Sequence, residues 1–138
     1  MQAKTLVAAW CAAVVTFLAL DALWLTVLMG DTYASYLGDM MLATPRWLPA
    51  ILFYLLYISA LLVFAVKPAL VKRDWRAAAL LGALLGLASY GTYDLTNLAT
   101  LRGWPWQLSV IDLAWGTFLS SVAASAGYAA GSKLRSGT

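Results

Sequence analysis

The chain has 138 residues, of which 63% are apolar and only 11% are charged, and its formal net charge is +3. A soluble domain would carry about 25% charged residues, so this composition predicts a single membrane-embedded domain covering residues 1–138. Histidine is absent and Cys11 is the single cysteine, which excludes an intrachain disulfide and Ser-His-Asp catalysis and disfavours a zinc site. The basic residues form no run, so we expect no nucleic-acid partner.

Four apolar stretches predict helices that cross the membrane, because each is near the 20 residues needed to span hydrocarbon. Their approximate ranges are 5–29, 48–66, 77–99 and 108–130. Pro49 lies in the first turn of the second stretch and Pro68 follows its end, while Gly131 is expected to stop the fourth. The expected fold class is therefore all-α, a four-helix transmembrane bundle.

The first stretch also begins as a secretory signal peptide would, with Lys4 before an apolar run. The run continues past the usual length of a signal peptide, contains Asp21 and lacks a small-residue cleavage site. We therefore interpret it as the first span and keep a cleaved signal peptide as the less favoured alternative.

The segment between the first two spans predicts a short amphipathic helix in the outer interface. Its apolar and aromatic side chains recur at helical spacing: Tyr33, Tyr36, Leu37, Met40 and Met41. Asp31 or Thr32 is expected to cap its start. Two roles stay open for it, an interfacial anchor and a lid over the outer ends of the spans.

The basic residues predict the orientation of the spans. Seven of them fall on the side of the two termini, namely Lys4, Lys67, Lys72, Arg73, Arg76, Lys133 and Arg135. Only Arg46 and Arg102 fall on the other side. By the positive-inside rule, we expect a multi-pass protein with both termini in the cytoplasm.

Three aspartates interrupt the predicted spans, and a charged side chain at the centre of a bilayer costs roughly 2.5–3.5 kcal/mol. Asp21 and Asp94 lie late in outward-going helices, and Asp112 lies early in an inward-going helix. At 1.5 Å per residue, all three would lie roughly 6 to 12 Å below the outer end of their spans. This common depth predicts one shared pocket in the outer leaflet.

Aromatic and amide side chains are expected to line the same pocket. Trp24, Asn97 and Trp115 each follow one of the three aspartates by three residues and present an N–H donor beside it. The further binding candidates are Tyr54, Tyr57, Tyr90, Tyr93 and Arg102. Two readings of these residues stay open, ligand contact and simple helix packing, and each aspartate singly fits an interhelical hydrogen bond.

Close carboxyl groups cannot all ionise cheaply, so a protonated aspartate beside an ionised one can act as a general acid beside a general base. In such a scheme the catalytic residues would be Asp94 and Asp112, with Asp21 tuning them and Tyr90 or Tyr93 relaying a proton. We expect no cofactor and no metal ion.

Gly82 and Gly86 form a Gly-x-x-x-Gly pair on the third span. Such pairs are typical of close helix packing, and this one is also the candidate face for a homo-oligomer.

A larger set of residues resembles a bacterial family of small integral membrane proteins known as domain of unknown function twenty-one seventy-seven. The resemblance is carried by the segment Tyr90-Gly-Thr-Tyr-Asp-Leu-Thr-Asn97, then Ala99-Thr100-Leu101 and Trp104, and by Asp21 with Trp24, Tyr33 with Leu37, and Asp112 with Trp115. It runs from about residue 15 to 120. It implies four spans in a bacterial inner membrane and supplies no activity.

Three functions remain open at this stage. The first is binding or modification of a membrane lipid or other apolar small molecule, as an enzyme or as a simple binder. The second is a small proton- or cation-coupled transporter. The third is a non-catalytic membrane component concerned with assembly or stress, whose polar groups serve helix packing.

Overall fold

The computed structural model describes residues 1–136, and no strand occurs among them. Its helical elements, in chain order, are α1 (Ala3–Leu23), η1 (Trp24–Leu28), α2 (Gly30–Leu37), η2 (Gly38–Met40), α3 (Trp47–Leu61), η3 (Leu62–Val66), α4 (Lys67–Lys72), α5 (Trp75–Thr100) and α6 (Trp106–Ser136). Here η1 and η3 are π-helical, and each continues the α-helix before it. The all-α fold class is confirmed.

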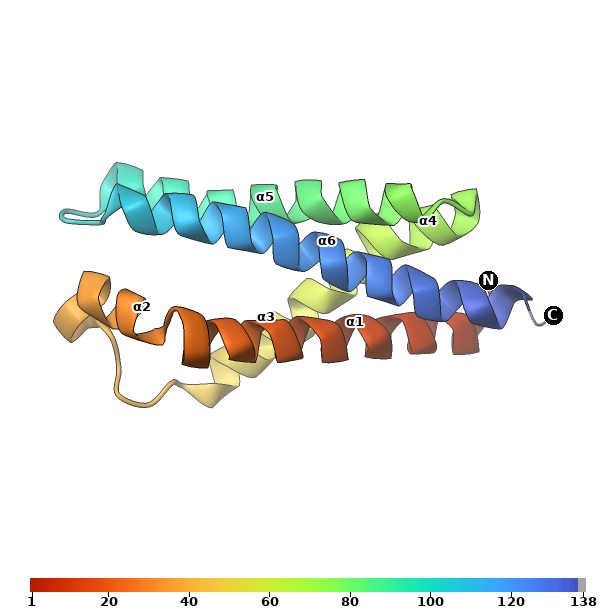
Figure 1. Cartoon of the computed structure of the whole chain (residues 1–138), viewed down its shortest axis with the longest axis horizontal. Coiled ribbons are helices and arrows are strands. Elements are labelled where there is room, and N and C mark those ends of the chain that lie inside the picture. Colours follow the sequence, from red (N-terminus) through yellow and green to blue (C-terminus); the bar gives the residue numbers. More distant parts are fainter. Residues whose placement is uncertain (137–138) are drawn as a thin grey trace.

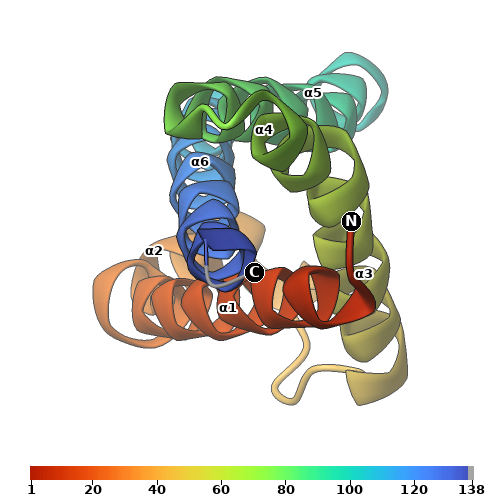
Figure 2. The ribbon, with the colours of Figure 1, turned by 90° about the vertical axis from the view of Figure 1, so that its right-hand side faces the viewer.

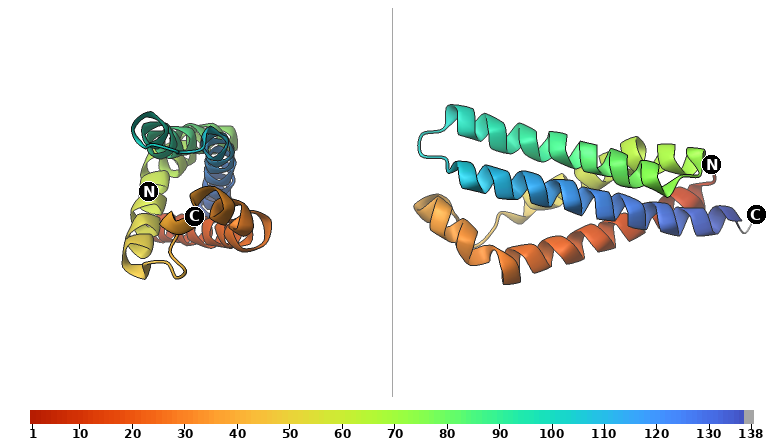
Figure 3. Two further views of the ribbon diagram at one scale, coloured as in Figure 1. Left: turned by 90° about the vertical axis from the view of Figure 1, so that its left-hand side faces the viewer. Right: turned by 45° about the horizontal axis from the view of Figure 1, so that its top comes forward.

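Long helices lie side by side along the molecule (Figure 1). Seen end-on, α1, α3, α5 and α6 form the four sides of a ring (Figure 2). The antiparallel hairpin of α5 and α6 and the pairing of α6 with α1 supply most contacts between elements. Both termini lie at the end of the bundle that also holds the turn between α4 and α5, while α2 and the loop after α5 lie at the opposite end (Figure 3).

Three helical stretches among the described residues are long and apolar enough to cross a membrane: Ala3–Leu28, Trp47–Lys72 and Trp106–Arg135. The helix α5 has 26 residues but carries more polar side chains, and it does not belong to this group. Large apolar side chains such as Val15, Leu56 and Leu80 are exposed on the outside. Such a surface suits a lipid environment.

The core is made largely of small residues, so the helix backbones approach closely. Ala9, Ala13, Ala123 and Ala124 are fully buried between α1 and α6 and their neighbours. A Cβ atom built on Gly86 would lie 2.3 Å from the carbonyl oxygen of Gly116 on α6. The absence of a side chain at Gly86 therefore allows α5 to pack closely against α6.

Gly82 and Gly86 of α5 pack against α6 of the same chain. A Cβ atom on Gly82 would lie 2.7 Å from both Ala124 and the carbonyl oxygen of Ser120, and both glycines are buried. The face that was the candidate for a homo-oligomer is thus covered by α6 of the same chain. A contact between two copies would need a different surface.

The second predicted stretch continues further than Pro68 was expected to allow. Its helix runs on to Lys72, because the π-helical turn η3 ends directly before Lys67 and Pro68 stands in the first turn of α4. A proline lacks the N–H and its ring collides with the carbonyl four residues earlier, and a wider π turn at that place accommodates both effects.

Two further boundary expectations were wrong. Gly131 does not stop α6, which continues to Ser136; a Cβ atom there would lie 3.0 Å from the Leu70 side chain, so the glycine makes room for α4. A helix, α2, does occur between the first two predicted spans, but it begins at Gly30 after Met29, and neither Asp31 nor Thr32 caps it through its side chain. The π turn η1 leads the chain directly into α2, which leaves no extended residue for a cap.

Candidate functional site

A cavity of about 620 Å³ lies at the end of the bundle that holds α2. Its lining side chains are mostly aromatic or aliphatic, and Asp21, Ser89 and Asp112 are the polar groups besides the tyrosines and tryptophans. The full lining is Asp21, Trp24, Leu25, Tyr33, Leu37, Met41, Phe53, Ser89, Tyr90, Tyr93, Trp104, Leu108, Asp112 and Trp115. We call this space the aspartate cavity. It draws residues from six helical elements, so the tertiary fold alone creates it.

Asp21 stands at one wall and joins three helices. Its side chain is 9% exposed and accepts a hydrogen bond of 2.5 Å from the Tyr54 hydroxyl on α3. The indole Nε1–H of Trp115 on α6 donates to the other carboxylate oxygen at 3.4 Å. Each oxygen of Asp21 therefore has a donor, and the carboxylate also holds α1, α3 and α6 together.

Asp112 on α6 also lines the cavity, and it accepts a hydrogen bond from a residue of α2. The Tyr33 hydroxyl donates a hydrogen bond to Asp112, and the Nε1–H of Trp24 donates to the Tyr33 oxygen at 2.8 Å. Burial, together with the hydrogen bond to the Asp112 carboxylate, raises the pKa of Tyr33 far above its ordinary value. The phenol of Tyr33 is thus a neutral donor at physiological pH.

The two Asp-x-x-Trp motifs are crossed in space. The rings of Trp24 and Trp115 stack with centroids 4.1 Å apart and planes 2° from parallel. Each tryptophan was expected to support the aspartate of its own helix; instead Trp115 bonds Asp21, and Trp24 reaches Asp112 through Tyr33. Stacking between η1 and α6 turns each indole N–H toward the partner motif, which explains the exchange.

Asp94 lies behind the cavity wall with no exposed surface. Neither of its carboxyl oxygens has a hydrogen-bond partner within residues 1–136, and the carboxyl group of Asp112 is among its neighbours. A buried carboxyl group without a donor is costly to keep in a membrane-embedded bundle. The structure therefore places two carboxyl groups near each other, with Asp112 lining the cavity and Asp94 enclosed by the protein.

The backbone behind Asp94 is braced by the loop that joins α5 to α6. The Ser109 hydroxyl donates to the Asp94 carbonyl oxygen at 3.2 Å, and the Trp104 Nε1–H donates to that hydroxyl at 3.0 Å. Ser109 is 2% exposed. This connection sets the position of the Asp94 backbone relative to α6 and so its approach to Asp112.

The four candidate tyrosines divide into different roles. Tyr54 bonds Asp21, as described above, whereas Tyr57 is 6% exposed and shares a 2.6 Å hydrogen bond with Ser120 in the core. Tyr90 lines the aspartate cavity, and its ring lies over Gly116, where a Cβ atom would be 2.2 Å from it. Tyr93 also lines the cavity, although its side chain is 56% exposed. The structure thus places two of the four on the cavity wall.

The remaining candidates lie outside the cavity lining. Asn97 is half-buried one turn after Tyr93 and does not line the cavity. Arg102 is exposed in the loop after α5 and does not line the cavity. Arg102 was a candidate because it is the basic residue nearest to Asp94 along the chain. The loop after α5 exposes its side chain, so closeness in sequence does not place it in the cavity.

Tyr33 and Ser109 are hydrogen-bonding residues of this site that sequence reasoning missed, and Ser89 on the cavity wall is another missed polar residue. Tyr33 was read as part of an apolar stripe, and the signal that could have found it is its place among the positions that carry the family resemblance. Ser109 carries no such signal, because a serine in an apolar helix is usually bonded to its own backbone.

Comparison with known proteins gives one match. A family model described as "Predicted membrane protein (DUF2177)" matches residues 6–129. No curated protein and no solved structure matches the chain. The matched range includes every side chain that lines the aspartate cavity.

Proposed function

The chain belongs to a family of predicted membrane proteins, and from this premise we propose that the aspartate cavity binds a lipid or another apolar small molecule. The observation that carries the proposal is a space of about 620 Å³ with apolar walls and carboxyl groups from two helices, Asp21 and Asp112, facing into it. Small-molecule sites commonly occupy about 300–1,000 Å³ and combine apolar walls with a few polar groups that orient the ligand.

The membrane placement proposed with this function has four spans. α5 is the fourth, because it lies antiparallel to α6 along its length and has 26 residues, enough to cross hydrocarbon (Figure 3). Both termini are then on the cytoplasmic side of a bacterial inner membrane, with the aspartate cavity in the outer leaflet and α2 in the outer interface. Asp94 on α5 is fully buried among the neighbouring helices. The exposed hydroxyls of Thr92, Thr96 and Thr100 donate hydrogen bonds to carbonyl oxygens of α5 itself, which reduces the cost of placing them at a membrane-facing surface.

The polar end of the ligand follows from the donors and acceptors of the cavity. Asp21 and Asp112 offer carboxyl oxygens, and the stacked rings of Trp24 and Trp115 offer aromatic surface beside them. Acceptors and aromatic faces favour a ligand whose polar end is a hydroxyl or an amine. Its apolar part would lie against Leu25, Leu37 and the neighbouring apolar side chains.

Modification of the ligand is the catalytic form of this proposal. Asp112 faces the cavity and would take a proton from a bound ligand, while Asp94 lies near it as a second, buried carboxyl group. Tyr33 donates to Asp112 and would keep its carboxylate oriented. Isomerisation, hydration or group transfer on a lipid-like substrate fits this arrangement.

Native mass spectrometry of gently extracted protein tests the binding proposal. We expect the wild-type chain to retain an apolar molecule and Asp112→Asn and Tyr33→Phe to lose most of it. Asp39→Asn is the matched control, because Asp39 is exposed in η2 and does not line the cavity. If Asp→Asn changes at positions 21, 94 and 112 lower thermal stability while no molecule is retained by the wild type, the polar groups serve helix packing alone.

Proton-coupled transport is a second candidate, favoured by the neighbouring carboxyl groups of the buried Asp94 and the half-buried Asp112. Intramembrane carboxyl groups that exchange a proton are typical of pumps and transporters. Reconstituted in proteoliposomes with a pH-sensitive dye, the wild type would then release protons when a toxic organic cation is added, and Asp94→Asn would abolish the release. A wild type that releases none rejects this candidate.

A further inference from the structure

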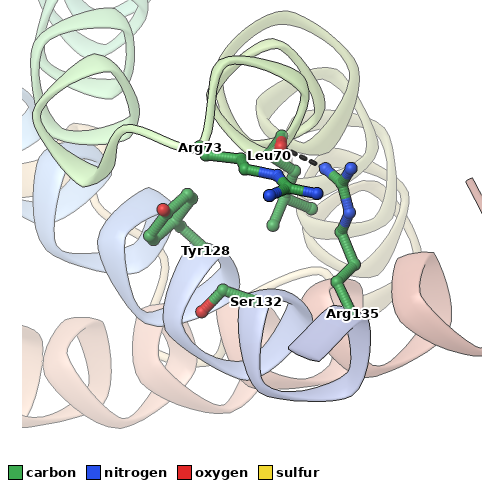
Figure 4. A pocket seen from close by; sticks show the side chains of 5 residues that line it. All are labelled: Leu70, Arg73, Tyr128, Ser132 and Arg135. Atoms are coloured by element: carbon green, nitrogen blue, oxygen red, sulfur yellow. Dashed lines mark hydrogen bonds between the residues drawn. The ribbon is translucent and has the colours of Figure 1, made fainter. Parts of the chain in front are cut away.

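A second cavity lies at the end of the bundle that holds both termini, remote from the aspartate cavity. It has a volume of about 340 Å³ and is lined by Leu70, Arg73, Tyr128, Ser132 and Arg135 (Figure 4). We call it the arginine cavity. Arg73 follows the end of α4 and the other polar residues come from the last turns of α6, so two distant parts of the chain build it.

Arg73 adopts a backbone conformation that arginine rarely takes. Its φ of 56° and ψ of 38° are left-handed. The amide of Asp74 bonds the carbonyl of Ala69 at 3.1 Å, and the amide of Arg73 bonds that of Leu70 at 3.3 Å. These two bonds form a Schellman motif with Arg73 at the position where glycine is strongly preferred. This backbone conformation costs free energy for any residue other than glycine. The presence of arginine there therefore suggests that its side chain has a role of its own.

Arg135 brings a second guanidinium to the same place. It donates a hydrogen bond to the Leu70 carbonyl at the end of α4, and Figure 4 shows the side chains of Arg73 and Arg135 directed toward each other beside Leu70. The two groups carry like charge, and a guanidinium presents five N–H donors in a planar fork, so Arg135 can contribute to binding an anion in addition to the partners that it already has.

The surroundings of this pair are basic. Lys72, Arg76 and Lys133 lie close by in the sequence. The one aspartate in this part of the chain is Asp74, whose carboxylate accepts a hydrogen bond of 2.9 Å from the amide of Arg76 and so caps α5. This carboxylate is therefore engaged by a helix terminus, while five basic residues lie in or near the arginine cavity along the chain.

We propose that the arginine cavity is a binding site for a phosphate group, held between the guanidinium groups of Arg73 and Arg135. Paired guanidinium groups match the oxygens of a phosphate in charge and geometry. Tyr128 presents a hydroxyl at the same cavity, while the Ser132 hydroxyl donates to the carbonyl of Ala129. The phosphate can belong to the headgroup of an anionic lipid or to a soluble phosphate, and this inference is independent of the proposed function of the aspartate cavity.

Arg73→Gly gives an unusually clean test, because glycine removes the guanidinium and also suits the left-handed backbone. The full-length protein is placed in phosphatidylcholine nanodiscs with and without phosphatidylglycerol, and retained phosphatidylglycerol is counted by native mass spectrometry. In a separate arm, the detergent-solubilised protein is heated with and without inorganic phosphate. We expect Arg73→Gly to reduce retention, or the concentration-dependent protection by phosphate, about 10-fold.

Arg76→Gln is the matched control, because it removes one positive charge from the same end without touching the cavity lining. Loss of phosphatidylglycerol in Arg73→Gly alone identifies a lipid headgroup, and loss of phosphate protection alone identifies a soluble phosphate. Arg73→Asn, which also tolerates the left-handed backbone, must repeat the result. Equal losses in Arg73→Gly and Arg76→Gln, or no binding of either probe by the wild type, would overturn the site.

Discussion

At the scale of single residues, the polar groups around the aspartate cavity bind in pairs that join different helices. Tyr54 reaches Asp21 from α3, Trp115 reaches it from α6, and Tyr33 reaches Asp112 from α2. A carboxylate surrounded by lipid-facing helices is costly unless such donors meet it. Each donor therefore contributes both to the stability of the bundle and to the orientation of a carboxylate toward the cavity.

Tyr54→Phe tests the stabilising part of this role. The change removes one donor from a carboxylate that is 9% exposed, so we expect the free energy of unfolding to fall by about 1–2 kcal/mol. Reversible unfolding in mixed detergent micelles measures it. Tyr36→Phe, on the exposed face of α2, is the control and should change stability little. Equal stability of Tyr54→Phe and the wild type would show that Asp21 does not depend on this bond.

The raised pKa of Tyr33 predicts a dependence on alkaline pH. Because the folded state favours the neutral phenol, its contribution to stability is complete below the ordinary pKa of about 10 and is lost as the pH rises above that value. We expect Tyr33→Phe to flatten this part of the stability profile, measured as melting temperature between pH 8 and 11. Tyr36→Phe should leave the slope as it is in the wild type; a Tyr33→Phe profile as steep as the wild type would contradict the assignment.

At the scale of elements, small residues and π turns decide how the helices meet. Gly82 and Gly86 let α5 approach α6, and Gly131 lets α4 approach the end of α6. The turn η3 carries α3 past Pro68 and into α4, so one continuous rod ends at the arginine cavity. The turn η1 ends α1 and places α2 over Asp112. Both cavities therefore depend on local departures from regular α-helix or on missing side chains.

Gly86→Ala is the prediction that belongs to this scale. Its new Cβ atom would meet backbone, the carbonyl oxygen of Gly116 at 2.3 Å, so α5 must move away from α6. We expect a loss of about 1–3 kcal/mol in unfolding free energy, measured in the same micelles. Leu84→Ala changes a side chain that is 62% exposed on the same helix and should have a much smaller effect. Comparable losses in both variants would argue against close packing as the cause.

At the scale of the whole molecule, the two cavities lie at opposite ends of one bundle. The aspartate cavity carries carboxyl groups and the arginine cavity carries guanidinium groups. Five of the six aspartates are at positions 21, 31, 39, 94 and 112, in elements that build or adjoin the first end. The basic residues gather toward the end with both termini. One end of the bundle is therefore acidic and the other basic. In the proposed four-span placement, the basic end lies on the cytoplasmic side of the membrane.

Cysteine labelling tests the placement. In a Cys11→Ser background, single changes Lys4→Cys and Lys133→Cys should both resist a membrane-impermeant maleimide on intact cells, and Asp39→Cys should react. Four spans put both terminal positions on one side, whereas three spans would put them on opposite sides. Labelling of only one of the two terminal cysteines would therefore contradict α5 as a span.

The sequence by itself determined that this is an all-α membrane protein, that helices occupy the four apolar stretches, and that Asp21 and Asp112 belong to one end. These properties follow from composition, hydrophobic length and spacing along single helices, which are local. Only the tertiary structure decided that Trp115 donates a hydrogen bond to Asp21, that Tyr33 donates one to Asp112, and that Arg73 and Arg135 line the same cavity. Such pairs depend on the rotation and separation of helices distant in the sequence, and these are set by side-chain packing across the whole bundle.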